Sequence, residues 1–533
     1  MIINGRIRLV VRIRRALISV SDKSGLDDLV KVLNDFKVEI ISTGGTAKQI
    51  AQLGIPVKSV SDITQFPEML DGRVKTLHPK IHGGLLALRD NPKHLDQLKE
   101  FNIEFIDMVV VNLYPFEKTV ADPSVEFEQA IENIDIGGPS MLRSAAKNAK
   151  SVAVICNPER YKDIIKELKE NSGALSSQTR TILAAEVFKR TYAYDRAIAD
   201  YLQNQIKPQG LENQLDEILD LQFRKVQDLR YGENPHQKAA FYKQKNAMAA
   251  SVANARQLHG KELSFNNIID LNAALNIVKD FQIPTASIVK HTNPCGAASA
   301  DKLYLAYKNA LDCDPMSAFG SIVGFNRKVD VETAQEILSA DFVECIIGPG
   351  FSLEALAMLK QKKNLRIMEV ADFVGMDRND LQELDYKRVS GGLLVQQNNI
   401  KILDQDNLKF VTSIKPTPEQ MKSLVFSWTI VKHVKSNAIV LGQDTKTVGI
   451  GAGQMSRVDS VMIAIRKAGI RCQGAVLASD AFFPKADSIE QAAKAGISAI
   501  IQPGGSIRDQ EVIDAAEKAG IAMVLTGTRH FCH

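Results

Sequence analysis

The first third of the chain alternates short apolar runs with amphipathic segments. Each apolar run is bounded by polar residues and is too short for a core helix, so we interpret the runs as buried strands. After the first run, apolar side chains recur at helical spacing from Leu26 to Leu33, and we expect Asp22 or Ser24 to cap that helix. A second helix is expected at Ala47–Leu53. Strands that alternate with helices predict a mostly parallel α/β sheet. The expected strands are Ala16–Val20, Val38–Ile41, Asp107–Val111 and Val152–Ile155.

Small polar residues follow these strands, at the sheet edge where ligands bind in folds of this kind. Thr43–Thr46 contains two glycines ahead of a helix, which suits a phosphate because backbone N–H groups and the helix start favour an anion. A plain strand-to-helix turn is the alternative. Arg73–Pro79 adds three potential cations, with a solvated basic loop as the alternative. Asp135–Lys147 opens a helical pattern at another glycine pair, with an ordinary helix cap as the alternative. Together these segments favour a phosphorylated small molecule as ligand.

The tetrapeptide Lys-Ala-Gly-Ile occurs three times in the last third of the chain, beginning at Lys467, Lys494 and Lys518. Each copy ends an amphipathic run and begins an apolar one. The lysine suits the negative end of a helix, and the glycine suits a left-handed cap. We therefore expect three helix–strand units whose strand ends share one crevice. Asp487 and Arg529 could meet a ligand there, although structure alone also explains both. The expected strands are Gly474–Ala478, Ile497–Ile501 and Ile521–Leu525.

A long helical pattern separates the first third from the rest of the chain. It covers Gln178–Asn204 and leads into Gln205–Gly210, whose proline and glycine predict a break between domains near residue 208. We therefore expect a basic extension at 1–14, a first domain at 15–208 and a second domain at 209–533.

A pair of polar residues follows the apolar run Ala286–Val289 in the second domain. Lys290 and His291 stand at this strand end as a candidate acid/base pair, with a structural histidine as the alternative. Two neighbouring motifs fail. Gly449–Gln454 lacks the third glycine of a dinucleotide fingerprint. Pro294-Cys295 lacks the second cysteine and the glutamate of a zinc deaminase. We expect neither a nicotinamide cofactor nor zinc or another metal.

Composition narrows the class of protein. The chain has 533 residues, of which 45% are hydrophobic and 24% charged, and its net charge is +4. These values are usual for a globular protein and give no sign of nucleic-acid binding. No apolar run reaches the ~20 residues of a membrane helix. The six cysteines form no CxxC pair, which favours free thiols and a cytoplasmic location. Met1–Arg15 carries five arginines but lacks the features of a secretory signal.

A series of segments, in order along the chain, resembles a known family. The segments are Ser19–Lys23, Thr43–Thr46, Arg73–Pro79, Asn112–Phe116 and Asp135–Gly138, followed by Leu229–Gln237, Lys290–Gly296, Ser317–Gly320, Ser436–Asn437, Gly449–Arg457, Ser479–Pro484 and Arg529–His533. The first five resemble the IMP cyclohydrolase half of the bifunctional AICAR transformylase/IMP cyclohydrolase family, and the others resemble its AICAR transformylase half. The resemblance spans about residues 15–533. It implies a methylglyoxal-synthase-like α/β sandwich followed by two cytidine-deaminase-like α/β subdomains without zinc.

The resemblance also implies the last two steps of de novo purine biosynthesis. A formyl group moves from the co-substrate 10-formyltetrahydrofolate to the amine of AICAR, and formyl-AICAR then closes to IMP with loss of water. The family forms homodimers whose transformylase sites contain residues of both subunits. A nucleotide-binding regulatory protein without turnover and a dinucleotide oxidoreductase are the alternatives. The broken glycine motif disfavours the oxidoreductase, and the intact Lys147, Lys290 and His291 disfavour the regulatory protein.

Roles for individual residues follow from the resemblance. In the transformylase half, His291 is expected to take the proton of the AICAR amine, and Lys290 to stabilise the oxyanion or to protonate the departing folate nitrogen. Glu344 stands where some members have aspartate. The residues expected around AICAR are Arg230, Tyr231, Asn267, Gly320, Glu344, Asn437 and Arg457, and those near the folate are Phe482, Asp487, Ser506 and Arg529.

In the cyclohydrolase half, Lys147 matches the proton-transfer lysine of the family, and Lys75, Tyr114 and Asp135 resemble its neighbours. The roles of Lys147 and Lys75 can be exchanged without conflict with the sequence. The residues expected to line the nucleotide are Ser21, Asp22, Lys23, Thr43, Gly44, Gly45, Thr46, Arg73, Thr76, Asn112, Ile136 and Gly138.

Overall fold

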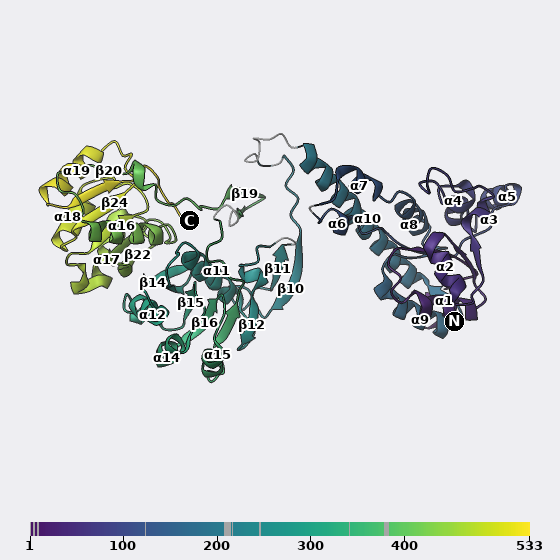
Figure 1. Cartoon of the computed structure of the whole chain (residues 1–533), viewed down its shortest axis with the longest axis horizontal. Coiled ribbons are helices and arrows are strands. Elements are labelled where there is room, and N and C mark those ends of the chain that lie inside the picture. Colours follow the sequence, from purple (N-terminus) through teal and green to yellow (C-terminus); the bar gives the residue numbers. More distant parts are fainter. Residues whose placement is uncertain are drawn as a thin grey trace. The chain divides into compact units, whose positions relative to one another are not determined.

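The computed structural model divides the chain into two compact units, Met1–Glu217 and Ile218–His533, which are labelled by element in Figure 1. Each unit is described by itself. The domain boundary predicted near residue 208 lies outside the described residues. The structure describes residues 2–3, 6–7, 10–122, 124–206, 215, 217–244, 247–340, 342–377 and 383–533.

A five-stranded parallel sheet forms the centre of the first unit, with strand order β6-β5-β4-β7-β8. The four strands expected from the apolar runs are confirmed, each within a residue of its expected bounds. The fifth, β6, is a short strand at the sheet edge whose middle residue, Lys58, is exposed, so no apolar run marks it. The strands are β4 (Arg15–Val20), β5 (Glu39–Ser42), β6 (Val57–Ser59), β7 (Met108–Asn112) and β8 (Ala153–Ile155).

Helices cover both faces of this sheet because neighbouring strand residues point to opposite sides. Ile18 belongs to a core with side chains of α1 and α9, whereas Leu17 belongs to a second core with side chains of α4, α8 and α10. The helices are α1 (Leu26–Asp35), α2 (Gly44–Gln52), α3 (Val60–Thr64), α4 (Pro79–Leu86), α5 (Pro92–Glu100), α6 (Phe116–Thr119), α7 (Phe127–Glu132), α8 (Gly137–Lys147), α9 (Tyr161–Glu170) and α10 (Ser177–Ile206).

Two local expectations for the first unit change. The predicted cap of α1 is wrong: Gly25 stands at the cap with a left-handed backbone and no side-chain hydrogen bond, while Asp22 accepts a hydrogen bond from the Ser24 N–H at 2.9 Å. The basic N-terminal segment also takes part in the fold. Its residues Val10–Arg12 form β3, which pairs antiparallel with β9 (Ala174–Ser176). Two short strands, β1 (Ile2–Ile3) and β2 (Arg6–Ile7), precede it.

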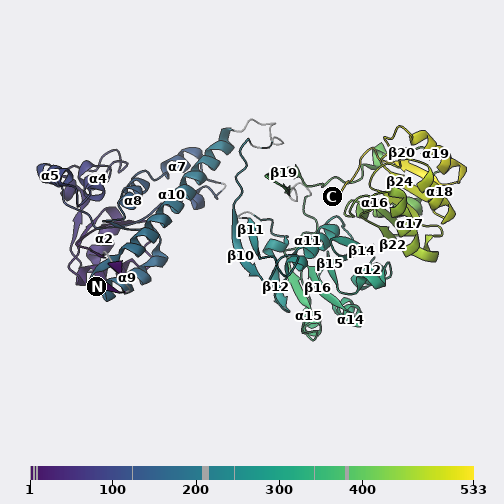
Figure 2. The same ribbon diagram turned by 180° about the vertical axis from the view of Figure 1, so that it is seen from behind.

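The second unit contains the same series of elements twice. Figure 2 labels the helices α11 and α12 of the first series and α16 and α17 of the second from behind. Each half runs helix, hairpin, helix, and then three strands separated by helices. The first half has α11 (Phe265–Lys279), β13 (Thr285–Lys290), β14 (Asn293–Ser299), α12 (Leu303–Leu311), β15 (Ser321–Phe325), α14 (Val331–Ser339), β16 (Val343–Gly348), α15 (Leu353–Leu359) and β17 (Arg366–Glu369). The second has α16 (Pro418–Val431), β21 (Ile439–Gln443), β22 (Lys446–Gly451), α17 (Arg457–Ala468), β23 (Val476–Ser479), α18 (Asp487–Lys494), β24 (Ala499–Gln502), α19 (Asp509–Lys518) and β25 (Ala522–Leu525).

One continuous sheet joins the two halves. Its order is β12-β17-β16-β15-β13-β14-β22-β21-β23-β24-β25-β20, and the halves meet where Ala298 of β14 pairs with Lys446 of β22. A central core combines α11 with α16, including Leu271 and Leu424. Each half adds a core of its own on the opposite face. The remaining elements are β10 (Phe223–Leu229), β11 (Ala239–Gln244), β12 (Arg256–His259), α13 (Pro315–Ala318), β18 (Leu384–Val389), β19 (Gly392–Gln397) and β20 (Lys409–Phe410).

The Lys-Ala-Gly-Ile repeats fall where the sequence predicts. Lys467, Lys494 and Lys518 lie in the last turns of α17, α18 and α19. The glycines that follow have φ angles of 57°, 79° and 69°. The three expected strands are confirmed as β23, β24 and β25, each beginning one or two residues later than expected. They pair in parallel, which brings their carboxyl ends to the same sheet edge.

Candidate functional sites

In the first unit, Asn112 organises the strand-end edge of the sheet. Its side-chain oxygen accepts hydrogen bonds from the Ser21 N–H at 2.6 Å, the Ser21 hydroxyl at 2.8 Å and the Asp22 N–H at 2.9 Å. Its amide donates back to the Asp22 carbonyl at 2.8 Å. The ends of β4 and β7 are therefore locked together, and the Ser21–Lys23 loop has a fixed course.

The neighbouring strand end forms an open cradle at the start of α2. Thr43 is its N-cap residue with an extended backbone, and its side chain makes no capping hydrogen bond, so the first N–H groups of the helix are available to a ligand. A Cβ on Gly45 would lie 3.4 Å from the Lys23 ammonium, so this cation stands beside the cradle. Thr46 is buried and exchanges hydrogen bonds of 3.1 Å with Val20. The arrangement suits a phosphate.

Asp135 is the centre of a second polar group at this edge. Its carboxylate accepts a hydrogen bond from the Gly138 N–H at 2.8 Å, at the beginning of α8. Burial raises the pKa of the Asp135 carboxyl group, against the lowering effects of the Gly138 and Tyr114 backbone and of the Lys75 charge. A Cβ on Gly138 would lie 2.3 Å from the Asp135 carboxylate, so this close approach needs glycine. The structure thus brings Lys75, Tyr114 and Asp135 together.

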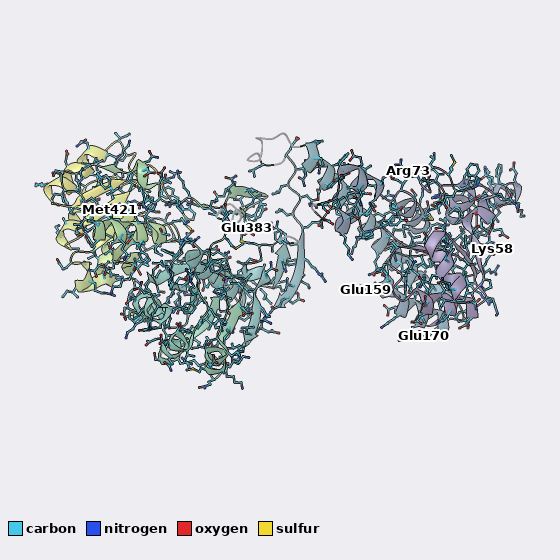
Figure 3. The ribbon with its side chains drawn as sticks, in the orientation of Figure 1. Lys58, Arg73, Glu159, Glu170, Glu383 and Met421 are labelled. Atoms are coloured by element: carbon cyan, nitrogen blue, oxygen red, sulfur yellow. The ribbon has the colours of Figure 1, made fainter. Side chains whose placement is uncertain are left out.

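Other expected residues surround this group. A Cβ on Gly137 would lie 2.8 Å from the Thr76 hydroxyl, which places Thr76 against the start of α8. The side chains of Tyr114 and Ile136 are 50% and 59% exposed, so both are open to a ligand. Arg73, labelled in Figure 3, forms an ion pair with Glu132.

Lys147 lies apart from this group. It is the last residue of α8, whose first residues contact Asp135. Nine residues of helix separate Gly138 from Lys147, a rise of about 13 Å. After α8 the chain turns into β8, where the Ala153 N–H donates to the Asp107 carbonyl next to the first residue of β7. The end of α8 is therefore at the opposite edge of the sheet from Asn112, and within one subunit the structure does not bring Lys147 to Lys75 and Asp135.

In the second unit, Lys290 and His291 stand at the turn between β13 and β14. Lys290 pairs with Asn293 across the hairpin, so His291 and Thr292 form a two-residue loop. The Lys290 ammonium donates to the Phe319 carbonyl at 2.7 Å, immediately before Gly320. His291 is exposed. The lysine is thus anchored, while the imidazole is open to solvent.

Expected nucleotide residues extend from this turn along the first half. Asn267 is buried near the start of α11 and donates to the Glu344 carboxylate at 3.0 Å, which also accepts from Arg366 at 3.3 Å. Glu344 is therefore tied to the expected AICAR residue Asn267. The Gly320 N–H donates to the Phe342 carbonyl at 2.8 Å.

Asn437 and Arg457 form a polar group in the second half. The Arg457 guanidinium donates to Asn437 at 2.7 Å, to Ser479 at 2.8 Å and to the Asp480 carboxylate. This group connects to the Lys290–Asn293 turn, because the Lys435 N–H donates to the Asn293 side chain at 3.0 Å. The structure therefore links the Lys290–Asn293 turn to the segment that carries Asn437.

The remaining expected residues lie in separate places. The Arg230 guanidinium stacks on the Tyr231 ring at 4.7 Å, just after β10. Phe482, Asp487, Ser506 and Arg529 follow the carboxyl ends of β23, β24 and β25, as the sheet rule predicts. Phe482 is 38% exposed, and Arg529 stacks over Phe531 at 4.6 Å. Within the described residues, none of these four side chains forms a hydrogen bond with the His291 turn.

Sequence reasoning did not single out two buried carboxylates. Asp270 accepts hydrogen bonds from the backbone of the His291 turn, and Asp480 holds Arg457. Asp480 lies in the segment Ser479–Pro484 that carries the family resemblance, two residues before Phe482, so its position was a usable signal. Asp270 lies within a helical pattern, so the sequence gave no signal of its role.

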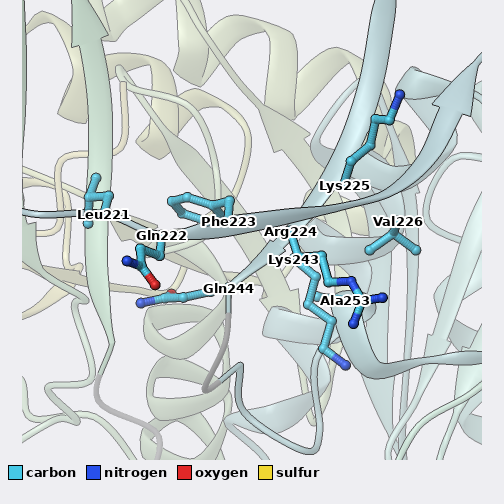
Figure 4. Close-up of a pocket in the computed structure, with 9 residues that line it drawn as sticks. All are labelled: Leu221, Gln222, Phe223, Arg224, Lys225, Val226, Lys243, Gln244 and Ala253. Carbon is cyan, nitrogen blue, oxygen red and sulfur yellow. The ribbon is translucent and has the colours of Figure 1, made fainter. Parts of the chain in front are cut away.

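A hollow of about 910 Å³ lies elsewhere in the second unit, along β10 and β11, as Figure 4 shows. Its lining includes Phe223, Arg224 and Lys243 but no expected site residue.

Within the described ranges, no cluster of three or more histidine, cysteine or acidic side chains could hold a metal ion. Burial raises the pKa of the Cys295 thiol to about 12. Among the described helices, none is long and apolar enough to cross a membrane.

Comparison with known proteins assigns the chain to a family. A family model described as MGS-like domain matches residues 25–140, and one described as AICARFT/IMPCHase bienzyme matches residues 145–467. The chain is 54% identical over 521 residues to "Bifunctional purine biosynthesis protein PurH" of Ruminiclostridium cellulolyticum and, equally, to that of Acetivibrio thermocellus. It is 53% identical over 520 residues to the protein of that name in Bacillus thuringiensis. Each alignment covers 98% of this chain and 100% of the relative.

An MGS-like α/β domain followed by a duplicated α/β unit defines the class as a two-part α/β bienzyme. The chain belongs to the AICARFT/IMPCHase bienzyme family. It is a bifunctional enzyme with AICAR formyltransferase and IMP cyclohydrolase activities, which are the last two steps of purine biosynthesis. The expected family, fold class and function are confirmed.

Proposed function

We propose that each unit carries one of the two reactions. The strand-end edge around Asp135 closes formyl-AICAR to IMP, and the turn at His291 transfers the formyl group. The observation that carries this division is that the two polar groups lie in separate units, each with its own cores. The formyl donor is 10-formyltetrahydrofolate, and the chemistry uses neither zinc nor a nicotinamide.

Formyl transfer needs a base, because the AICAR amine is conjugated with a carboxamide and is a weak nucleophile. The amine nitrogen attacks the formyl carbon while the His291 imidazole takes the amine proton, directly or through the carboxamide. Lys290 stabilises the developing oxyanion. The bond to the folate nitrogen then breaks, and this nitrogen receives a proton. The 2.7 Å hydrogen bond from Lys290 to the Phe319 carbonyl supports a fixed ammonium at this place.

Binding residues surround this turn in the proposal. Asn437 and Arg457 hold the AICAR nucleotide, together with Arg230, Tyr231, Asn267, Gly320 and Glu344. The link from Lys435 to Asn293 supports a shared site, because it ties the Asn437 segment to the His291 turn. Phe482, Asp487, Ser506 and Arg529 hold the folate.

Ring closure requires attack of the carboxamide nitrogen on the formyl carbon. One proton leaves each of the two nitrogens, and the formyl oxygen departs as water. The phosphate lies at the start of α2 beside Lys23, while Lys75, Tyr114 and Asp135 surround the reacting atoms. Burial raises the pKa of the Asp135 carboxyl group, which brings it closer to neutral pH and supports a part in proton transfer.

Lys75 is the better candidate for the proton-transfer lysine. Its charge acts on Asp135, whereas Lys147 is at the far end of α8. Lys75→Ala is expected to abolish cyclisation of supplied formyl-AICAR. Lys147→Ala is expected to retain it, and loss of cyclisation in Lys147→Ala with full activity in Lys75→Ala would reverse the assignment.

We also propose a cytoplasmic homodimer that binds no nucleic acid, with transformylase sites completed by both subunits. Exposed apolar side chains on two hairpins support a covered surface in the second unit. Phe223, Val226 and Tyr242 of β10–β11 are 46%, 55% and 51% exposed, and Leu394 of β19 is 61% exposed. Sedimentation of the purified protein tests the dimer, and a monomer with full transformylase activity would contradict shared sites.

The division of labour has a direct test. Purified protein is supplied with AICAR and 10-formyltetrahydrofolate for transfer, or with formyl-AICAR for cyclisation, and tetrahydrofolate and IMP are followed by absorbance. His291→Ala is expected to abolish transfer and leave cyclisation intact. Normal transfer by this variant would overturn the role of His291.

A further inference from the structure

The turn that carries His291 has an unusual backbone. It is a two-residue loop between paired Lys290 and Asn293, and His291 and Thr292 have φ angles of 52° and 62°. Two left-handed residues in a two-residue hairpin loop are the mark of a type I′ turn, which strongly prefers Asn-Gly or Asp-Gly. Left-handed backbone is unfavourable for a β-branched residue such as threonine. The chain therefore adopts a type I′ turn without the Asn-Gly or Asp-Gly pair that favours it.

The second half of the unit offers an internal comparison. Its equivalent hairpin, β21–β22, turns at Asp444-Thr445 between paired Gln443 and Lys446. There Asp444 has a φ of 50°, and Thr445 is not among the described residues with positive φ. Aspartate is one of the residue types that tolerate this conformation. Histidine tolerates it too, so the difference between the two turns is the left-handed threonine, Thr292, which only the turn at His291 contains.

A buried carboxylate from another element supports the strained turn. Asp270 lies on α11 and is 7% exposed. Its two oxygens accept hydrogen bonds from the Thr292 N–H at 2.7 Å and the His291 N–H at 3.3 Å. Burial raises the pKa of Asp270, and these two N–H groups oppose that effect. Asp270 thus satisfies both N–H groups of the loop.

We infer that Asp270 is a positioning residue for formyl transfer: it holds the His291–Thr292 turn in its left-handed form and so aims the imidazole at the AICAR amine. The inference deepens the proposed role of His291 and rests on it. Misplacing a catalytic group by about 1 Å can cost on the order of 100-fold in rate. Among the described residues, Asp270 forms its hydrogen bonds with the His291–Thr292 turn and not with the proposed AICAR-binding residues, so we expect its loss to lower kcat more than it changes the binding of AICAR.

The kinetic test separates positioning from binding. Asp270→Ala and Asp270→Asn are expected to lower transformylase kcat about 10- to 100-fold, with KM for AICAR changed less than about threefold. Asparagine keeps the shape but has one oxygen to accept hydrogen bonds, so one loop N–H loses its partner. Asp444→Asn, the same chemical change at the equivalent turn, is the matched control and should keep kcat within about twofold. Unchanged kcat in both Asp270 variants would overturn the inference.

A second substitution tests the mechanism of the effect. Thr292→Gly places the preferred residue of a type I′ turn at the second loop position. If Asp270 acts by holding the left-handed backbone, glycine should restore kcat at least about fivefold in the Asp270→Ala background, more than its effect in the parent enzyme. Equal effects in both backgrounds would show that Asp270 acts otherwise. Thermal unfolding shows whether Asp270→Ala folds. If it does not fold, the same comparison is made with Asp270→Asn.

The proposed role of His291 can be refuted independently of the inference about Asp270. If His291→Ala retains normal transfer, the proposed role of His291 is wrong whatever the Asp270 variants do. If His291→Ala abolishes transfer while both Asp270 variants match the parent enzyme, only the Asp270 inference is wrong.

Discussion

Lys467 differs from the equivalent lysines of the other two Lys-Ala-Gly-Ile repeats. Its ammonium forms an ion pair with Asp314 of the first half and lies 3.3 Å from the Ser317 hydroxyl. Lys494 and Lys518 occupy the same place at the ends of α18 and α19 but are exposed. Replacing each lysine by methionine therefore removes the same interaction with a helix end. Only Lys467→Met also breaks an ion pair between the two halves.

The expected cost follows from the exposure of the pair. The Lys467 and Asp314 side chains are 33% and 12% exposed. Breaking a fully buried pair costs 3–5 kcal/mol, whereas exposed pairs contribute about 0–1 kcal/mol. Because the Lys467–Asp314 pair is partly buried, we expect Lys467→Met to lower the free energy of unfolding by about 2 kcal/mol. The two control variants should each change stability by less than about 0.5 kcal/mol.

Urea unfolding followed by tryptophan fluorescence measures this difference, because Trp428 is buried in the central core of the second unit. Lys467→Met should have a clearly lower free energy of unfolding than Lys494→Met and Lys518→Met. Equal values for all three variants would refute the reasoning that the ion pair stabilises the junction.

The pH dependence of this difference has a defined sign. Burial would raise the pKa of Asp314, but the hydrogen bonds from Lys467 and Ser317 outweigh it and hold the pKa below its usual value. A lowered carboxyl pKa stabilises the fold above the unfolded pKa of about 3.9, and this contribution is lost as pH falls through the folded pKa. The difference in free energy of unfolding between the parent protein and Lys467→Met should therefore be largest near pH 7 and should decrease below about pH 4.

Three further substitutions test the two sites. Gly138→Ala places a Cβ 2.3 Å from the Asp135 carboxylate; it should abolish cyclisation and destabilise the first unit by about 1–3 kcal/mol, while normal IMP formation would contradict the packing argument. Asp135→Asn should lose cyclisation yet unfold at an equal or higher temperature at pH 7. Burial raises the pKa of Asp135, so the free energy of unfolding falls as pH rises through that pKa and the carboxylate ionises. A lower unfolding temperature of the variant would contradict this, because it would show that the ionised carboxylate stabilises the fold. Arg457→Lys loses the guanidinium fork that reaches Asn437, Ser479 and Asp480; KM for AICAR in formyl transfer should rise about tenfold or more, and an unchanged KM would remove Arg457 from the nucleotide site.

Much of the fold was predictable because buried parallel strands are short apolar runs between polar turns. The strands Arg15–Val20 and Met108–Asn112 are of this kind, and their ends also marked the candidate ligand edge. The edge strand Val57–Ser59, whose middle residue Lys58 is exposed, has no such signal. The cap of α1 was missed because Gly25 supplies a left-handed backbone in place of a capping side chain.

The sites were predictable where they lie in strand-end loops and not where they depend on tertiary contacts. Asn112 ends a strand, and Thr43 and His291 each follow one, so these positions marked them as candidates. Asp270 was not, because a single acidic residue in a helical pattern is indistinguishable from a solvent-facing one until packing is known. Lys147 could have been placed from the sequence, because a helix that starts at the ligand edge carries its last residue about 13 Å away.

The central core beneath α11 and α16 has a practical consequence for recombinant expression. Leu271 and Val278 come from the first half and Leu424 and Trp428 from the second, so neither half can bury its apolar surface alone. A truncation between the halves would leave that surface open to water and yield aggregating fragments. The first unit has both of its cores within residues 13–201, so it is the piece to produce in isolation for a test of the proposed ring closure.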